Sequence, residues 1–459
     1  ERTAVAEPTE IEIPVRYDGE DLDSVAATVG LTTSEVVAIH GATNYRAAFM
    51  GFAPGFAYLV GLPETLVVGR RSEPRAMVPA GSVAIADSYS AVYPRSTPGG
   101  WHLLGTSDAV LFDPHRRPAA LLAAGTSVRF VEVRDRHQPR TEPAIANSPA
   151  PSPAPSPPYP APHGGPPVTV FEVIDPGPLT TVQDRGRSGH AGDGVPPSGA
   201  ADAPSAALAN RLVGNSEDAA VLETTMSGPT LRLGGPMGSR RTVVVTGAVA
   251  TVTVDGVGRA VNAPFDLRSG QALEIGAASA GLRTYVAVSG GLEVPTVLGS
   301  RSADVLSGLG PPALRAGDVV ALGVDCGRRP GVDVAPVALA APPVTLQVAP
   351  GPRADWLSAD GHHLLVSATW TVAPSSNRVG VRLNGPSLGR ARQEELAPEG
   401  LVTGAIQLTP SDELVVFLRD HPVTGGYPVV AVVDDGDLGV VAQLRPGDEV
   451  KLRANEVYR

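Results

Sequence analysis

Leu444–Leu452, with the sequence LRPGDEVKL, predicts a tight turn followed by a half-buried strand. Pro446 and Gly447 have the order that a type II turn requires, with glycine at positive φ. Val450 and Leu452 then alternate with polar neighbours, as the two faces of a strand demand. The same spacing of leucine, glycine and two alternating apolar residues recurs at Leu122–Phe130, Leu267–Ile275 and, with a one-residue slip, Leu314–Leu322. We therefore expect a mainly β chain built from three related barrel modules.

The composition agrees with a chain of turns and short strands. At 459 residues the chain is too long for one core, and it contains 52 Gly and 46 Pro. Its formal charge of −11 disfavours a nucleic acid or an anionic membrane as partner. No run approaches the ~20 apolar residues that span a bilayer, and the first residues show no basic and apolar leader. We expect a cytoplasmic protein.

Lysine and cysteine are so rare that several kinds of site are excluded. Lys451 is the single lysine, and it lies in a predicted strand. A P-loop needs a Gly-Lys-Ser/Thr sequence, and a biotin carrier needs an exposed lysine in a turn, so neither is expected here. A Ser-Lys hydrolase is disfavoured for the same reason. Because Cys326 is the single cysteine, an intrachain disulfide is impossible, and no metal site is predicted.

A proline-rich segment divides the chain. Ser148–Pro155 alternates proline with small residues, so this segment can neither continue a helix nor join a sheet. Such a spacer suits two proteins that form a complex and are joined in one chain. The predicted domains are an α+β lobe at 1–64, a barrel at 65–140, the linker at 141–167, and two further barrels at 168–335 and 336–459.

Three helices and a broken strand are readable from local signals. Residues 21–30 place apolar residues on one face and end at a glycine, which predicts a left-handed cap. Thr32–Glu35 has the pattern of a capping box opening a helix that ends near His40, a cation favoured at that end. Asp202 is predicted to cap a third helix that Gly214 ends. Thr242–Val254 is expected to form two strand runs broken at Gly247.

Glycines and aromatic residues are concentrated in Gly51–Leu59, sequence GFAPGFAYL. Because glycine lacks a Cβ, a ligand could approach the backbone amides closely, with flat aromatic walls around it. A bulged strand with core aromatic residues explains the same sequence without a ligand. The substrate-binding candidates in this stretch are Gly51, Phe52, Pro54, Gly55 and Phe56.

Arginines accompany glycine-rich loops in the next fifty residues. A planar guanidinium beside free backbone amides suits a carboxylate or a phosphate, although loop scaffolding would also explain the glycines and prolines. The candidates in these loops are Arg75, Gly81, Ser82, Arg95, Gly99, Gly100 and Trp101.

Two polar clusters stand out after the linker. The sequence from Gln183 to Arg187 packs an amide, a carboxylate and two guanidiniums into five residues, and Ser198 follows in a glycine- and proline-rich loop. Gln183 could hydrogen-bond a lactam or a urea-like amide, and Asp184 could orient a water molecule. Asp202 is best explained as a helix cap alone.

The second cluster, Asp420–Pro428, places a carboxylate, a hydroxyl, glycines and a phenol on one loop between strands. Its candidate residues are Asp420, Thr424, Gly425, Gly426 and Tyr427, and the structural alternative is a plain hairpin turn. The G-x-S-x-G match at Gly385–Gly389 is set aside, because a nucleophile elbow needs a parallel α/β sheet around it.

With these motifs in view, the chain resembles a fusion of two known families. Residues 11–133 resemble the B-type subunits of 5-oxoprolinase, a family also known for sporulation-kinase inhibitors, and residues 168–455 resemble the C-type subunits of the same enzyme. For the B-type family the resemblance is carried by Gly51–Leu62, Val78–Ala86 and Ser96–Leu104. For the C-type family it is carried by Gly177–Arg187, Gly194–Asn215, Ser376–Leu383, Gly404–Gln407, Asp420–Pro428 and Gln443–Gly447.

The resemblance implies cyclophilin-like β-barrel modules behind a small N-terminal α+β lobe. It also implies a separate A-type 5-oxoprolinase protein as partner, ATP with Mg²⁺ as cofactor, and the opening of 5-oxoproline to glutamate with cleavage of ATP to ADP and phosphate. The same modules form the carboxyltransferase part of urea carboxylase, which leaves carboxyl transfer as an alternative, with biotin on another protein. A regulator that binds a histidine kinase is a third alternative. Allophanate hydrolysis is disfavoured, because its Ser-Ser-Lys triad cannot be built here.

Under the oxoprolinase hypothesis, the roles divide between arginines and carboxylates. Arg75, Arg95 and Arg187, with glycine-rich amides, would hold the substrate carboxylate and the developing oxyanion. Asp184 or Asp420 would position water or accept a proton. The chain is expected to be inactive without its A-type partner.

Overall fold

The computed structural model describes residues 10–133 and 168–454, except residues 326, 329, 330, 333, 338, 393 and 395. The predicted linker and Cys326 lie outside the described residues. By its internal contacts the chain divides into two compact units. Unit 1 takes Glu1–Ala150 and two later segments, Gly189–Pro196 and Pro422–Gly425, while unit 2 takes the remainder. Unit 1 is thus built partly from residues that follow the linker in sequence.

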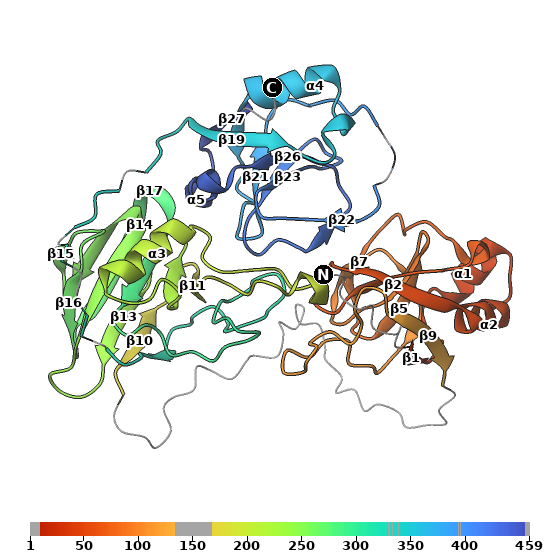
Figure 1. The fold of residues 1–459 in the computed structure, drawn as a ribbon, viewed down its shortest axis with the longest axis horizontal. Helices are drawn as coiled ribbons and strands as arrows, with labels where there is room; N and C mark the ends of the chain where they lie inside the picture. Colours follow the sequence, from red (N-terminus) through yellow and green to blue (C-terminus); the bar gives the residue numbers. More distant parts are fainter. Residues whose placement is uncertain are drawn as a thin grey trace, which may run out of the picture. The chain divides into compact units, whose positions relative to one another are not determined.

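Unit 1 is a seven-stranded sheet with two helices packed against it (Figure 1). The strands follow the order β1-β9-β2-β3-β6-β5-β8. Strands from both predicted N-terminal ranges, 1–64 and 65–140, belong to this one sheet. Its elements are β1 (Glu10–Val15), β2 (Asn44–Met50), β3 (Ala57–Val60), β5 (Ser82–Ala86), β6 (Tyr89–Val92), β8 (His102–Thr106) and β9 (Ser127–Glu132), with the pair β4 (Arg75–Val78) and β7 (Thr97–Gly99), and the short helices η1 (Glu64–Leu66) and η2 (Ala191–Asp193).

The two helices of unit 1 confirm their sequence signals. Helix α1 (Leu22–Val29) ends at Gly30, which has a φ of 72° in the left-handed region. Helix α2 (Thr33–Ala42) begins with the predicted capping box, in which the Thr32 side chain and the Glu35 side chain each accept a backbone N–H of the other residue. The predicted apolar face is also confirmed, because Leu22, Val25 and Ala26 are buried in the core.

The expectation that His40 is a helix-end cation is wrong. Its ring is fully buried and stacks on Phe130 with the ring centroids 4.6 Å apart. Ser90 Oγ donates to the Ala84 carbonyl, so His40 Nε2 donates to Ser90 Oγ and His40 Nδ1 accepts from Tyr17. Burial lowers the pKa of His40 to about 3, so the imidazole is neutral at physiological pH.

Unit 2 begins with a nine-stranded sheet, against which α3 lies along β14 and β17 (Figure 1). The predicted helix is confirmed, because α3 (Ala203–Leu212) begins after Asp202, whose side chain accepts the Ser205 N–H. The strands are β10 (Val170–Asp175), β11 (Thr180–Gln183), β12 (Val221–Thr224), β13 (Thr230–Gly234), β14 (Arg240–Val254), β15 (Val257–Arg259), β16 (Phe265–Arg268), β17 (Ala272–Val288) and β18 (Val319–Ala321).

The predicted break at Gly247 is wrong, because β14 continues through it. Gly247 has a φ of 86°, and the pairing of β14 with β17 changes register directly after it. A Cβ at Gly247 would lie 2.4 Å from the Arg283 carbonyl oxygen. Glycine here permits a bulge that bends one long strand, and it does not end the strand.

The last module of unit 2 is a closed barrel with the strand order β19-β26-β23-β24-β21-β20-β27. Its strands are β19 (Val344–Pro350), β20 (Thr369–Val372), β21 (Gly380–Asn384), β23 (Ala405–Leu408), β24 (Leu414–Phe417), β26 (Val429–Val433) and β27 (Glu449–Ala454). The remaining elements are η3 (Ala354–Trp356), α4 (Ala359–Ser367), β22 (Glu399–Gly400), η4 (Asp435–Asp437) and α5 (Leu438–Gln443), with β25 (Thr424–Gly425) in the segment that belongs to unit 1.

The recurring turn of the sequence is confirmed in all of its copies. Gly125, Gly270, Gly317 and Gly447 have φ values of 93°, 90°, 89° and 89°, and each precedes a strand. The prediction of a mainly β chain of barrel-like sheets with a small α+β lobe is confirmed.

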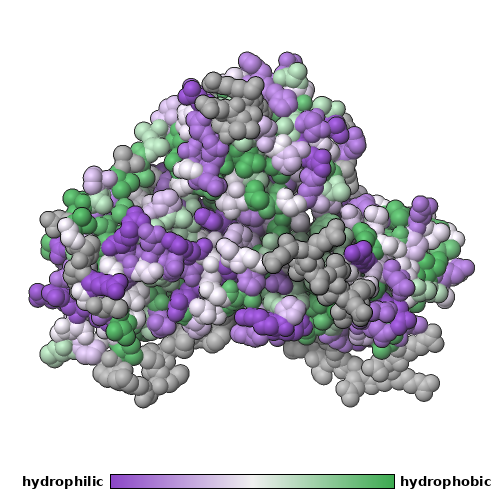
Figure 2. Space-filling model, in the orientation of Figure 1, coloured by the Kyte–Doolittle hydropathy of each residue, from purple (hydrophilic) through white to green (hydrophobic). Residues whose placement is uncertain are grey.

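The surface carries scattered apolar residues. On the face shown in Figure 2, hydrophilic and hydrophobic residues are interspersed. Among the described residues no single helix is long and apolar enough to cross a membrane, and α1 and α2 satisfy that test only as a pair bent by 93°.

Candidate functional site

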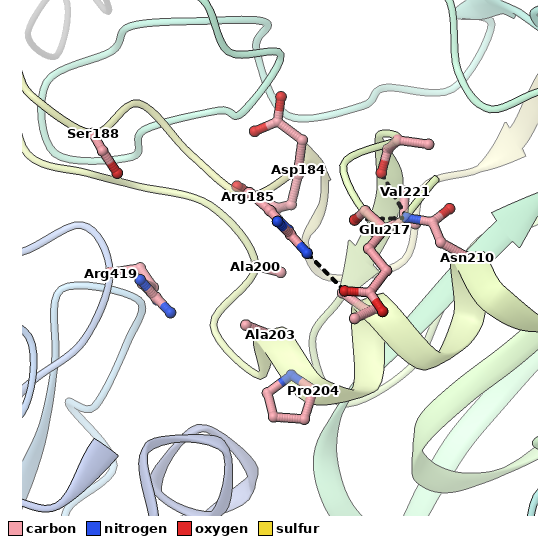
Figure 3. A pocket seen from close by; sticks show the side chains of 14 residues that line it. Asp184, Arg185, Ser188, Ala200, Ala203, Pro204, Asn210, Glu217, Val221 and Arg419 are labelled. Atoms are coloured by element: carbon pink, nitrogen blue, oxygen red, sulfur yellow. Dashed lines mark hydrogen bonds and ion pairs between the residues drawn. The ribbon is translucent and has the colours of Figure 1, made fainter. Parts of the chain in front are cut away.

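A cavity of about 460 Å³ lies in unit 2 beside the end of β11 and the first turns of α3 (Figure 3). Helix α3 contributes mostly small side chains to the wall, among them Ala203, Ala206 and Ala207, which leaves the space open. The polar groups of the wall come from other segments, apart from Asn210 of α3. They are Gln183, Asp184, Arg185, Ser188, Asn210, Glu217 and Arg419.

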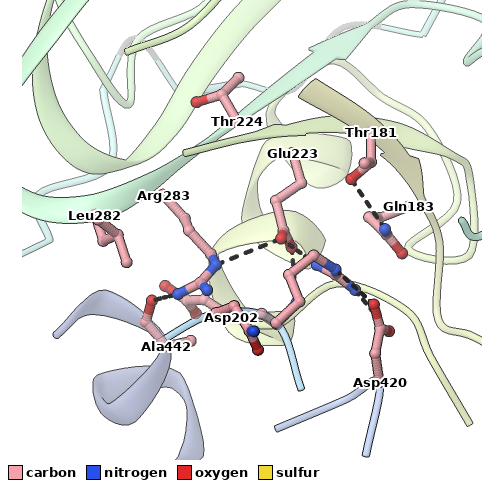
Figure 4. A network of polar contacts seen from close by, with 12 residues as sticks. Thr181, Gln183, Asp202, Glu223, Thr224, Leu282, Arg283, Asp420 and Ala442 are labelled. Atoms are coloured by element: carbon pink, nitrogen blue, oxygen red, sulfur yellow. Dashed lines mark hydrogen bonds and ion pairs between the residues drawn. The ribbon is translucent and has the colours of Figure 1, made fainter. Parts of the chain in front are cut away.

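Gln183 lines this cavity, and its side-chain carbonyl oxygen is buried and unsatisfied. The residue is fully buried at the end of β11. Its Nε2 donates to Thr181 Oγ1 at 3.0 Å and to the Ala303 carbonyl at 3.1 Å (Figure 4). Because the Ala303 carbonyl can only accept, the side-chain amide orientation is fixed, and Oε1 is left without a hydrogen-bond partner among the described residues. A buried acceptor without a donor is costly, so this oxygen is a feature of the fold that requires an explanation.

Asp184, the next residue, is saturated by donors of its own chain. Its Oδ1 accepts from Gly186 N at 2.7 Å and from the hydroxyls of Ser300 and Ser302 at 2.6 Å each, and its Oδ2 accepts from Arg301 N at 2.6 Å. The carboxylate therefore ties the segment that carries Gln183 to the loop at residues 300–302.

The arginines around the cavity differ in their partners. Arg185 pairs with Glu217 at 2.6 Å (Figure 3) and with Asp218 at 2.7 Å, and it is largely exposed. Arg187 is only 2% exposed, and it donates to Ser198 Oγ at 3.0 Å and to the carbonyls of Val297 and Ser302. Both guanidiniums are thus committed to groups of this chain.

Arg419 has no such partner. Its guanidinium is half-buried at the cavity wall, and no hydrogen bond or ion pair of the described residues involves it. Burial lowers its pKa, since desolvation disfavours the cation. The backbone at this position is nevertheless fixed, because the Arg419 carbonyl accepts the Ser198 N–H at 3.0 Å.

Asp420, the residue after Arg419, belongs to a buried charge network (Figure 4). Its Oδ2 accepts from Arg378 Nε at 3.0 Å and from Val305 N at 3.1 Å, and its Oδ1 accepts from Arg378 Nη2. Asp420 is fully buried, and burial raises the pKa of its carboxyl although Arg378 opposes that shift. Arg378 also pairs with Glu223 of β12. Arg378 therefore joins the closed barrel to the nine-stranded sheet.

Glu223 is the centre of this network. It accepts from Tyr285 at 3.0 Å and from Ala201 N at 2.8 Å, and Arg283 lies 3.5 Å away. Burial alone would raise the pKa of Glu223, but Arg378 and Arg283 outweigh it, and the pKa is lowered. Two arginines thus hold the buried carboxylate in its charged form.

The network reaches the closed barrel a second time through Gln443 at the end of α5. Gln443 Nε2 donates to Asp202 Oδ2 at 2.8 Å, and Gln443 Oε1 accepts from the N–H groups of Leu282 and Arg283 at 2.9 Å each. Asp202, predicted as a helix cap alone, is therefore both a cap and a contact between the modules of unit 2.

The predicted aromatic site in unit 1 is a packed cluster. Phe56 and Trp101 are nearly buried, and their ring centroids lie 5.6 Å apart. Phe52 has a positive φ of 62°, and its N–H donates to Thr424 Oγ1 at 3.2 Å. A Cβ at Gly51 would lie 1.8 Å from that oxygen. Gly51 is required here by the close approach of Thr424.

Three other predicted glycines of unit 1 also lie close to other parts of the chain, either to a backbone carbonyl or to a side chain. The Gly55 N–H donates to the Asp193 carbonyl, a Cβ at Gly81 would lie 2.3 Å from the Ser107 carbonyl oxygen, and a Cβ at Gly99 would lie 2.4 Å from Tyr93 Oη. Pro54 and Ser82 are buried, whereas Gly100 is half-buried.

The predicted arginines of unit 1 lie at the start of β4 and in the turn before β7. Arg75 donates to Asp21 at 2.9 Å and to Glu20 at 3.2 Å, and these carboxylates raise its pKa. Arg95 is half-buried in the turn between β6 and β7.

The remaining candidates of the second polar cluster lie close together in sequence. Gly425 lies in β25 and Gly426 follows it, while Tyr427 is 46% exposed. The substrate-binding roles assigned to these residues stay predictions.

Among the predicted residues, the structure brings Gln183 and Asp184 together at the cavity and places Asp420 next to its wall. Sequence reasoning missed Arg419, Arg378, Glu223 and Arg283. Arg419 had a usable signal, because it directly precedes the predicted Asp420 in a loop between strands. Among the described residues no group of three or more His, Cys, Asp and Glu side chains is arranged to hold a metal ion.

Comparisons with protein families match both halves of the chain. Residues 193–454 match the family described as carboxyltransferase domain, subdomain A and B. Residues 1–122 match carboxyltransferase domain, subdomain C and D. The predicted resemblance to a fusion of two families is confirmed.

Individual relatives carry two different names. The chain is 52% identical to the B-type subunit of 5-oxoprolinase from Escherichia coli O157:H7, over 26% of its own length and 57% of the relative. It is 30% identical to the C-type subunit of 5-oxoprolinase from Escherichia coli K12, over 61% of its length and 90% of the relative. It is also 36% identical to urea amidolyase of Lachancea kluyveri, over 61% of its length but only 17% of that enzyme. The chain thus spans a small part of the amidolyase and about half of the B-type relative.

A solved structure has the same overall architecture. The crystal structure of TTHA0988 superposes with a TM-score of 0.84 at 36% identity, and the match covers 97% of this chain and 85% of the other.

Proposed function

The chain belongs to the carboxyltransferase-domain family, and on that premise we propose that it is the joined B-type and C-type component of an ATP-dependent 5-oxoprolinase. In this proposal it is inactive alone and works with a separate A-type protein. The observation that carries the proposal is the buried Gln183 Oε1, an acceptor without a donor at a cavity of about 460 Å³. A lactam offers the N–H that this oxygen lacks.

The chain's own residues would bind and orient the lactam. Gln183 would accept the ring N–H, which fixes the plane of the amide in the cavity. The cavity volume lies within the range of about 300–1,000 Å³ typical of small-ligand sites. Asp184 and Asp420 are each committed to several donors, so we propose that they position their neighbours Gln183 and Arg419 rather than transfer protons.

The cavity does not fit ATP. Arg185 is already paired with Glu217 and Asp218, so among the described residues of the wall Arg419 alone is left to meet a triphosphate, which carries several negative charges. The described residues also offer no carboxylate group arranged for Mg²⁺. We therefore propose that the A-type protein holds the nucleotide.

The test is release of ADP that depends on 5-oxo-L-proline. The chain is assayed alone and after reconstitution with an A-type protein, and turnover is expected only in the complex. Gln183→Met removes the acceptor at nearly constant volume and is expected to reduce kcat/KM by about tenfold to a hundredfold, as loss of one hydrogen bond in a dry site does. Gln271→Met, at the exposed turn before β17, is the matched control. Equal turnover of the Gln183 and Gln271 variants would contradict the proposal.

Carboxyl transfer is the second candidate function. The similarity to urea amidolyase favours it, and a urea N–H could also donate to Gln183. Biotin would then be carried by another protein, because Lys451 lies within strand β27. ATP cleavage that depends on urea, bicarbonate and a biotin-carrying partner, and not on 5-oxoproline, would establish this alternative.

A further inference from the structure

Arg419 differs from Arg185, which lines the same cavity, and from the nearby Arg187 and Arg378, because no hydrogen bond or ion pair holds its guanidinium among the described residues; Asp435 and Glu223 act on its charge only from beyond ion-pair distance. Arg185 pairs with two carboxylates, Arg187 donates to a hydroxyl and two carbonyls, and Arg378 pairs with two buried carboxylates. Arg419 lines the same cavity as Gln183, and no contact within the described part of the chain satisfies its guanidinium. Arginine stays protonated even where burial disfavours the cation. The cavity wall therefore contains a half-buried positive charge, that of Arg419, which forms no ion pair among the described residues and could bind an anionic ligand.

The position of Arg419 is fixed on both sides. Its carbonyl accepts the Ser198 N–H at 3.0 Å, and the next residue, Asp420, is clamped by Arg378 and by Val305 N. Gln183 is held in the same way, because Asp184 beside it accepts four hydrogen bonds. Two anchored segments therefore contribute Gln183 and Arg419 to the wall of a single cavity. Such preorganisation reduces the ordering cost of binding.

We infer that Arg419 is the specificity-determining residue of this site, and that it binds the carboxylate of a small amide whose N–H is bound by Gln183. This inference rests on the proposed function and deepens it. A guanidinium binds a carboxylate through charge-assisted, often paired hydrogen bonds, which are stronger than neutral ones. A neutral amide such as urea satisfies Gln183 alone and leaves the Arg419 charge uncompensated. The ligand class is therefore a cyclic amide that carries a carboxylate.

The other charges at the wall do not cancel this preference. Glu217 is paired with Arg185 and Arg211, and these arginines lower its pKa. Asp184 is saturated by backbone and hydroxyl donors. Neither carboxylate pairs with Arg419 in the described part of the chain, and the carboxylates that act on its charge, Asp435 and Glu223, lie beyond ion-pair distance, so a ligand carboxylate would form the first ion pair of this guanidinium.

The test compares two ligands that differ only in the carboxylate. Binding of 5-oxo-L-proline and of 2-pyrrolidinone to the full chain is measured by calorimetry, for the wild type, Arg419→Gln and Arg419→Lys. Arg240→Gln removes the same charge from an exposed pair with Asp266, neither of which lines the cavity, and is the matched control. Arg419→Gln is expected to weaken 5-oxo-L-proline binding by about tenfold to a hundredfold, as loss of a charged hydrogen bond does, and to change 2-pyrrolidinone binding by less than about twofold. The affinity of Arg419→Lys for 5-oxo-L-proline is expected to lie between those of the wild type and Arg419→Gln.

The opposite results overturn the inference. They are an unchanged affinity of Arg419→Gln for 5-oxo-L-proline, an equal loss for both ligands, or no measurable binding of 5-oxo-L-proline to the wild-type chain. A matching thermal unfolding midpoint shows that the variant is folded, and Arg419→Lys preserves the charge if Arg419→Gln is unstable. The proposed function fails separately, through absence of 5-oxoproline-dependent ADP release in the wild-type complex. If the wild-type complex turns over 5-oxo-L-proline and Arg419→Gln has an unchanged KM, the inference is wrong and the proposed function still holds.

Discussion

Gln183 and Arg419 share a local arrangement, since each is followed by an aspartate that the fold has already committed. Asp184 and Asp420 look like catalytic acids in the sequence, because carboxylates in loops beside glycines often are. In the structure their oxygens face donors of this chain, which fixes the two residues that line the cavity. At the scale of single residues, the two aspartates thus position the backbone, and their neighbours Gln183 and Arg419 are the candidates for ligand contact.

Arg378 is expected to contribute strongly to the stability of unit 2. It is 2% exposed between Glu223 and Asp420, so Arg378→Met leaves Asp420 without its cation and Glu223 with Arg283 alone. Breaking a buried ion pair from one side costs about 3–5 kcal/mol. Thermal unfolding should show a correspondingly large drop in midpoint.

Arg382→Met is the control for that variant. Arg382 lies on β21 close by in sequence, but its pair with Glu413 is 42% exposed on the arginine side. An exposed pair is worth about 0–1 kcal/mol, so its midpoint should hardly change. Similar midpoints for the two variants would show that the buried network contributes little.

His40 predicts a pH dependence of unit 1. The folded state holds the imidazole neutral with a pKa of about 3, whereas the unfolded chain protonates it near its ordinary value of about 6.5. Between these values the unfolded state binds more protons, so stability falls as the pH decreases through that window, by about 1.4 kcal/mol for each pH unit at most.

Hydrogen exchange of peptides covering α2, corrected for the intrinsic rate at each pH, measures this effect. Wild-type protection should fall as the pH decreases from the ordinary histidine pKa of about 6.5 by about two units, and His40→Gln should show a shallower slope over the same range. Parallel slopes in the two proteins would exclude His40 as the source.

At the scale of elements, sequence reasoning succeeded where the cause is local. The turn glycines Gly270 and Gly447 were predicted from spacing alone, because positive φ is a property of one residue and its immediate neighbours. The capping box at Thr32 was predicted for the same reason. The predicted strand break at Gly247 was wrong. Whether such a glycine ends a strand or forms a bulge within it depends on the partner strand, here β17.

The site was less predictable than the elements. Gln183 was chosen from the sequence, but its free oxygen depends on Ala303, which lies 120 residues away. Arg378 and Glu223 are 155 residues apart, and nothing in either segment marks a charge that will be buried. Polar groups are assigned partners only by tertiary packing, which local patterns do not contain.

The contact of Gly51 with Thr424 gives a prediction for the loops of unit 1. Gly51→Ala places a methyl group against Thr424 Oγ1 and is expected to destabilise unit 1 by about 1–3 kcal/mol through overpacking. Thr424→Gly in the same chain should restore part of that loss by removing the clash. Thermal unfolding of the single and double variants measures both effects.

Gly69→Ala is the control, because nothing lies within 4 Å of a Cβ placed there. It should leave the midpoint nearly unchanged. If Gly51→Ala behaves like Gly69→Ala, the close approach of Thr424 does not constrain the loop.

At the scale of the whole molecule, the predicted linker does not coincide with the boundary between the two compact units. Unit 1 includes Gly189–Pro196 and Pro422–Gly425, although both segments follow the linker. A chain with a protease site inserted in the linker should therefore elute from a sizing column as one species after complete cleavage. The two fragments should separate only under denaturing conditions.

Gly194→Val tests the cause of that association. A Cβ at Gly194 would lie 2.7 Å from the Ala53 carbonyl oxygen, whereas nothing lies within 4 Å of a Cβ at Gly192. After cleavage, Gly194→Val is expected to weaken association of the fragments by at least about tenfold, through a clash that costs more than about 1.4 kcal/mol. Gly192→Val should behave as the unmodified chain. Separate elution of the unmodified fragments would contradict the shared unit.

The scarcity of lysine gives unit 2 a practical property. Lys451 is exposed in the middle of β27, held between β19 and β20 of the closed barrel. An amine-reactive dye therefore has one side-chain target, on a strand rather than on a mobile loop. With the α-amino group blocked, fluorescence anisotropy of the Lys451 label would report the tumbling of the barrel itself, and would test whether an added A-type protein slows it.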